Sequence, residues 1–173
     1  MKKSSSSAAL PIAHLVLRIL VVVNWVAGAF ILVLLALMPT TQWIKTALKL
    51  PPSSDDPVII GLQAVAFLGL VSIPVNYAIL KRLLAMVDTV RAGDPFVAAN
   101  ADRLRVIAWL LLTLQVLGIM IGAIARSIST PAHPIRIDAG FSINGWLAVL
   151  LTFLLARVFA QGATMRDDLE GTV

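Results

Sequence analysis

The chain has 173 residues, of which 59% are hydrophobic and only 13% are charged, against about 25% charged residues in an ordinary soluble domain. This balance excludes a typical soluble protein and predicts an integral membrane protein. The formal net charge of +5 is better explained by the excess of basic residues on the cytoplasmic side of a membrane protein than by affinity for nucleic acid. The chain has no cysteine, which excludes disulfides, thiolate catalysis and thiolate metal sites.

The N-terminal part predicts a tail followed by a membrane helix. Residues 1–11 are basic and rich in serine, and we expect them to be disordered. From Ile19 to Met38 the chain has 20 residues, among which only Asn24 is strongly polar. At about 1.5 Å per residue this run covers about 30 Å, one hydrocarbon core. It is longer than the apolar core of a cleavable signal peptide, so we expect an uncleaved helix at about 12–38.

A second membrane helix is predicted at about 58–80. Pro74 is expected to kink it, because proline removes an internal hydrogen bond. Beyond residue 80 the apolar positions continue at helical spacing, with charged residues between them. The sequence therefore predicts an amphipathic extension into the cytoplasm that ends near Gly93. Its apolar positions are Leu80, Leu83, Leu84, Val87 and Val90.

The stretch from Arg91 to Trp109 is a basic hairpin at the junction of two long apolar segments. It holds more residues typical of helix ends and turns than any other part of the chain. Gly93 can end a helix, because glycine adopts the left-handed conformation without a Cβ clash. Asp94 can cap the next helix, and Pro95 suits its first position, where no backbone N–H is needed. Asn100 offers a second cap just before the third apolar run. The pattern predicts a tight connection between two helices.

The third and fourth membrane helices are expected at about 102–125 and 141–160. Gly118 and Gly122 form a GxxxG step, a close-packing device that serves internal packing and dimerisation equally well. The fourth helix is expected to continue past Arg157 as a second amphipathic extension. Its predicted apolar stripe is Val158, Gly162, Met165 and Leu169.

The distribution of lysine and arginine predicts the orientation. Ten fall on the side of the termini and the hairpin, and four fall on the other side. The more basic side belongs in the cytoplasm, so we expect four spans in a bacterial inner membrane with both termini cytoplasmic. The ten are Lys2, Lys3, Arg18, Lys81, Arg82, Arg91, Arg103, Arg105, Arg157 and Arg166, and the four are Lys45, Lys49, Arg126 and Arg136.

The sequence shows few residues in arrangements typical of catalysis or of ligand binding. No convergent set of acids, bases, nucleophiles or metal ligands is visible in it, so we expect no enzyme activity, no cofactor and no metal site. A small transporter or channel subunit is the alternative function. It rests on Pro74 and on the intramembrane polar residues Asn24, Asn76 and Gln115, which are too few and scattered to establish a pore.

Two motifs resemble those of a known family. GDPFVAAN at 93–100, followed by RLRVIAW, is similar to the central motif of the domain of unknown function 2975 family, and FAQGATMRDDLEGTV at 159–173 is similar to its C-terminal signature. GFS at 140–142 also fits, and the resemblance covers about residues 12–173. With Asp94, the matching positions are our structural or partner-contact candidates: Gly93, Pro95, Phe96, Asn100, Phe159, Gly162, Asp168, Leu169 and Val173.

The resemblance implies a bacterial four-helix membrane core and a regulatory partnership, because members are often encoded beside a small helix-turn-helix regulator. We therefore expect an all-α, four-helix membrane bundle with cytoplasmic extensions that modulates or sequesters such a partner without binding nucleic acid itself. A homo-oligomer is also a candidate. The hairpin is net basic and the C-terminal segment net acidic. We predict that Val158, Met165 and Leu169 pack on Leu83, Val87 and Phe96. The alternative is that the two apolar stripes rest separately on the bilayer surface.

Overall fold

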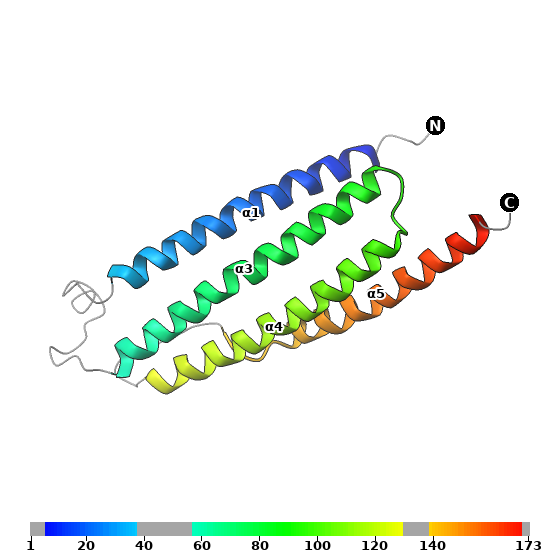
Figure 1. The fold of residues 1–173 in the computed structure, drawn as a ribbon. Helices are drawn as coiled ribbons and strands as arrows, with labels where there is room; N and C mark the ends of the chain where they lie inside the picture. Colours follow the sequence, from blue (N-terminus) through cyan, green and yellow to red (C-terminus); the bar gives the residue numbers. More distant parts are fainter. Residues whose placement is uncertain (1–5, 38–56, 130–138, 171–173) are drawn as a thin grey trace.

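The computed structural model describes residues 6–37, 57–129 and 139–170 (Figure 1). Four α-helices make up most of these ranges: α1 Ser6–Leu37, α3 Pro57–Arg91, α4 Ala98–Ile128 and α5 Ile143–Glu170. All four are long and apolar enough to cross a membrane. The predicted all-α, four-helix fold is confirmed, and its helices are those of a multi-pass membrane protein.

The helix ends differ in places from the expected ones. α1 begins at Ser6 and contains Pro11, so it includes residues 6–11, which we had assigned to the disordered tail. α3 runs as one helix from Pro57 to Arg91, as expected from the continuing apolar pattern. Which part of each helix lies in the bilayer stays a prediction.

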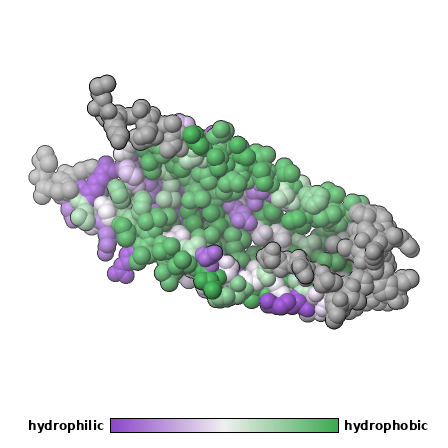
Figure 2. Space-filling model, turned by 180° about the vertical axis from the view of Figure 1, so that it is seen from behind, coloured by the Kyte–Doolittle hydropathy of each residue, from purple (hydrophilic) through white to green (hydrophobic). Residues whose placement is uncertain are grey.

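The helices pack in chain order. α1 packs on α3, α3 on α4, and α4 on α5, while α1 has no packing contact with α4 or α5 in the described ranges. Figure 1 shows this open row. Much of the described surface is therefore hydrophobic, as Figure 2 shows from behind. This surface suits contact with lipid chains.

Polar side chains near Pro74 bond to the backbone of α3. Asn24 Nδ2 of α1 donates to the carbonyl of Ile73 at 3.1 Å. Within α3, Asn76 Nδ2 donates to the carbonyl of Ser72 at 3.1 Å. Two of the polar residues that motivated the channel alternative are thus engaged with helix carbonyls, a common role for amide side chains between membrane helices.

An aromatic contact and a polar contact complete the α1–α3 interface. The rings of Trp25 and Tyr77 lie 5.6 Å apart between centroids. Nearer the hairpin, His14 Nε2 lies 3.5 Å from Asp88 Oδ1. These contacts place the start of α1 beside the end of α3.

The α4–α5 interface is close because glycine occurs where the helices meet. The amide of Gln115 occupies the space that a Cβ on Gly145 would take. Trp109 and Phe153 pack edge to face, with centroids 5.4 Å apart. Gln115, the third residue behind the channel alternative, therefore lies in the helix interface.

Candidate functional site at the hairpin

The end of α3 is a Schellman motif centred on Gly93. Gly93 has φ +86°, the left-handed conformation predicted for it. Its N–H donates to the carbonyl of Val90 at 3.1 Å, and the N–H of Asp94 donates to that of Thr89 at 3.0 Å. These two bonds satisfy carbonyls that the helix end would leave without partners.

The predicted caps of the next helix are wrong. α4 begins at Ala98, with Val97 in an extended conformation before it and no side-chain capping bond. Asp94 and Pro95 therefore lie in the connection, and Asn100 lies inside the first turn. The physical reason is local, because a residue before proline is disfavoured in the helical region and the chain remains extended after Gly93.

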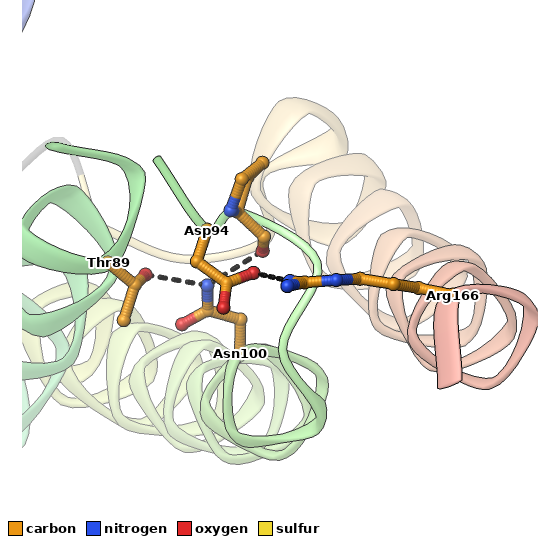
Figure 3. A network of polar contacts seen from close by, with 5 residues as sticks. Thr89, Asp94, Asn100 and Arg166 are labelled. Atoms are coloured by element: carbon orange, nitrogen blue, oxygen red, sulfur yellow. Dashed lines mark hydrogen bonds and ion pairs between the residues drawn. The ribbon is translucent and has the colours of Figure 1, made fainter. Parts of the chain in front are cut away.

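Asp94 instead reaches a different helix. Its Oδ1 forms an ion pair with Nη1 of Arg166 on α5, shown in Figure 3. The two side chains are 36% and 41% exposed, so solvent screens the attraction. Ion pairs of this kind contribute about 0–1 kcal/mol, so this one orients the end of α5 more than it stabilises the fold.

Asn100 is the buried centre of the hairpin, with 0% exposure. Its Nδ2 donates to Thr89 Oγ1 at 2.7 Å and to the carbonyl of Pro95 at 2.9 Å (Figure 3). Its Oδ1 accepts from Arg103 Nη1 at 2.7 Å. One amide side chain thus joins the end of α3, the connection and the start of α4, as a buried polar group requires.

An aromatic contact seats α5 on the same hairpin. The rings of Phe96 and Phe159 lie 5.2 Å apart between centroids. A Cβ on Gly162 would lie 3.0 Å from Phe96 Cδ1, so the absence of a side chain there makes room for the ring. Ala163, beside Gly162, is 3% exposed. Small residues therefore let α5 approach closely.

The predicted docking is right for Phe96 and wrong for Val158, Met165, Leu83 and Val87, while the side chain of Leu169 lies outside the described residues. Val158 and Met165 are 50% and 67% exposed, because the contacting stripe is Phe159, Gly162, Ala163 and Arg166. Leu83 and Val87 instead line a groove between α3 and α1, since α5 does not pack on α3. The predicted and the observed stripes of α5 both recur at helical spacing. The small residues Gly162 and Ala163 allow close approach and therefore favour the observed stripe.

The remaining candidates lie near the end of α5. Asp168 is exposed on its last turns. The side chain of Leu169, and all of Val173, fall outside the described residues. Sequence reasoning overlooked Thr89 and the pairing of Arg166. The available signal for Arg166 was its position seven residues after Phe159, on the same helix face.

The described ranges contain no cluster of three or more His, Asp or Glu residues that could hold a metal ion. The arrangement is a packed corner between two segments distant in sequence. Its members bond mainly to one another, through an amide network, an aromatic pair and an ion pair. The corner is therefore a surface of defined shape, in which polar and aromatic side chains hold one another in place.

Together, the helices and this corner define a multi-pass helical membrane protein. The family described as Protein of unknown function (DUF2975) matches residues 39–173, so the chain belongs to that family. The match confirms the resemblance of the two motifs, and it begins just after α1. No curated protein and no solved structure matches the chain.

Proposed function

We propose that this protein is a non-enzymatic component of the bacterial inner membrane that binds a cytoplasmic protein at the hairpin corner and thereby sequesters or modulates it. The observation that carries the proposal is the meeting of the two family motifs. Asp94 pairs with Arg166 and Phe96 packs against Phe159, although these segments are far apart in the chain. A surface built from two segments that carry the family motifs suits recognition of a partner.

The orientation rests on charge. The ten basic residues on one side and four on the other favour a cytoplasmic hairpin. The first helix turn of α1, the hairpin and the end of α5 lie toward one end of the molecule (Figure 1). A cytoplasmic partner would thus have the corner, the start of α1 and the end of α5 within reach.

The surface also offers apolar contacts. Phe96 keeps 45% of its surface exposed, and Met165 is 67% exposed one turn beyond Gly162. Apolar side chains surrounded by charged ones are typical anchors of a protein interface. A small helix-turn-helix transcription regulator is the partner that the family resemblance favours.

Orientation is tested by reporter fusions at residues 50, 92, 132 and 173. We expect periplasmic signals at 50 and 132, and cytoplasmic signals at 92 and 173. A periplasmic signal at 92 would overturn the orientation.

Partner binding is tested by affinity purification from membranes and mass spectrometry. We expect a small DNA-binding protein to co-purify with the native chain and to be lost from Met165→Asp, which leaves the packed side of α5 unchanged. Leu150→Ala, altered on the exposed lipid-facing part of α5, is the control and should retain the partner. Absence of any cytoplasmic protein from the native sample would contradict the proposal.

A further inference from the structure

Two contacts between α1 and α3 lie on the same side of this antiparallel helix pair, which Figure 1 shows at one edge of the row. His14 Nε2 lies 3.5 Å from Asp88 Oδ1, and the rings of Trp25 and Tyr77 lie 5.6 Å apart between centroids. His14 and Trp25 are about three helical turns apart, and so are Tyr77 and Asp88. Each helix therefore presents one line of side chains to the other, and the two lines form the walls of what we call the α1–α3 crevice.

A cation lies on each wall of this crevice, between the two contacts. Arg18 lies on the α1 line, about one turn from His14, and Lys81 lies on the α3 line, about one turn from Tyr77. Both side chains are exposed, and no hydrogen bond or ion pair within the described ranges engages either of them. The crevice keeps a net positive charge when the carboxylate of Asp88 is counted.

The two cations lie close enough to share one ligand. The contacts at the two ends set the register, which places Arg18 level with Leu84, about one turn from Lys81. Their levels along the helices therefore differ by about 5 Å, and the axes of packed helices lie about 8–10 Å apart. Both side chains are long, and both residue types bind phosphate oxygens. Two such cations suit a single phosphate group.

An apolar groove continues the crevice beyond the aromatic pair. Its volume is about 480 Å³, and the small residues Gly28 and Ala29 leave room for it on α1. Gly28 lies about 15 Å along the helix from Arg18, which is half the thickness of a hydrocarbon core of about 30 Å. The groove thus lies at the depth that the acyl chains of one leaflet occupy. Its other lining residues include Trp25, Leu70, Ile73 and Pro74.

A phospholipid presents a phosphate and then an acyl chain in the same order as the crevice presents cations and then a groove. Basic pockets between membrane helices attract anionic headgroups. A zwitterionic headgroup carries its own cation, which the positive charge of Arg18 and Lys81 repels, whereas an anionic headgroup does not. The charge of the crevice therefore favours the anionic class.

We propose that the α1–α3 crevice binds one anionic phospholipid, with its phosphate between Arg18 and Lys81 and one acyl chain running past Trp25 into the groove. The lipid belongs to the leaflet at the hairpin end of the molecule. The site is separate from the hairpin corner, and it does not depend on the cytoplasmic partner.

Tryptophan fluorescence tests this site, because Trp25 lines the groove and a brominated acyl chain quenches an indole that it contacts. The chain has four tryptophans, and the other three are replaced by phenylalanine in the full-length protein. The protein is reconstituted in phosphatidylcholine vesicles that contain a small share of brominated phosphatidylglycerol or of brominated phosphatidylcholine. A matched reporter keeps only Trp109, which is 58% exposed on α4, against 54% for Trp25. We expect phosphatidylglycerol to quench Trp25 at least about tenfold more efficiently than phosphatidylcholine does, and Trp109 less than about twofold more efficiently.

Substitutions in the Trp25 reporter assign the two parts of the site. Arg18→Gln and Lys81→Gln should each reduce the preference for phosphatidylglycerol about fivefold. Arg157→Gln removes an equal charge from α5 and should leave the preference unchanged. Arg18→Lys keeps the charge and should keep the preference, which separates loss of the site from loss of the fold. Ala29→Leu fills the groove without changing charge, and it should weaken quenching by phosphatidylglycerol.

Several results would overturn the proposal. Equal quenching of Trp25 by the two brominated lipids would show that the crevice does not select an anionic headgroup. An equal preference at Trp109, or one that survives Arg18→Gln combined with Lys81→Gln, would show a general attraction of anionic lipid to the protein. Relief of quenching by inorganic phosphate would make a free anion the ligand, and an unchanged preference in Ala29→Leu would place the acyl chain outside the groove. Lipid is present on both faces of the vesicle, so the result is independent of orientation and of partner binding.

Discussion

Replacing Asn100 with alanine removes the centre of the hairpin. The change deletes two donated bonds, to Thr89 and Pro95, and the bond accepted from Arg103. A neutral hydrogen bond contributes about 0.5–1.5 kcal/mol and one to a charged group about 1.5–3 kcal/mol. Arg103 is half-buried and can turn toward water, which reduces its share. We expect Asn100→Ala to lower the free energy of unfolding by about 2–4 kcal/mol.

The assay is chemical unfolding of purified protein in mixed micelles. Thr89→Val is the matched variant, because it keeps the side-chain shape and removes one partner of Asn100, at a cost of about 1 kcal/mol. Limited proteolysis should show earlier cleavage in 92–97 for Asn100→Ala. A free energy of unfolding for Asn100→Ala equal to that of Thr89→Val, with no change in cleavage, would refute the assigned role of the network.

Two further predictions concern the contacts of α5. Asp94→Arg and Arg166→Asp should each expose the end of α5 to protease, and the double exchange should restore protection, with a coupling of about 0.2–1 kcal/mol that weakens in high salt. Failure of the exchange to restore protection would exclude an orienting role for the pair. Gly122→Ala should cost about 1–3 kcal/mol in thermal stability, because its Cβ would overlap the backbone carbonyl of Ala139. Gly118→Ala, whose nearest atom is 3.7 Å away, should cost far less, and equal costs would contradict the placement of residues 139–142.

Local patterns were enough to predict the helices and the turn at Gly93. Long apolar runs exceed the length that a membrane span needs, so their helical state follows from backbone hydrogen bonding in lipid. Gly93 is followed directly by Asp94 and Pro95, and a glycine there supplies the left-handed residue of a Schellman motif. These features depend on a few adjacent residues, which the sequence displays directly.

The contacts between helices were harder to predict. Two stripes of α5 share Gly162 and have the same spacing, so periodicity alone does not choose between Val158 and Phe159. The close approach allowed by Gly162 and Ala163 decides it. Asp94 resembles a cap by composition, yet its partner is Arg166 on another helix. Such pairings depend on the register of α5 on α4, which no local pattern contains.

The start of α5 illustrates the same limit. The sequence predicts a fourth membrane helix at about 141–160, within an uncharged run that begins at Ala139. The structure divides it, since helix begins only at Ile143 and the preceding residues lie against Gly122. Hydropathy reports that residues are apolar, but it does not report their helical state or level.

The most direct test of the proposed partner surface is photo-crosslinking in living cells. A photoreactive residue is placed at Met165, 67% exposed beside the corner, and in a separate variant at Leu150, 63% exposed on the membrane part of α5. We predict that residue 165 forms an adduct with a small cytoplasmic helix-turn-helix protein, that Asn100→Ala weakens this adduct, and that residue 150 forms none with that protein. Equal adducts at both positions, or no protein adduct at 165 from chains present at normal level, would contradict a cytoplasmic partner at the hairpin corner.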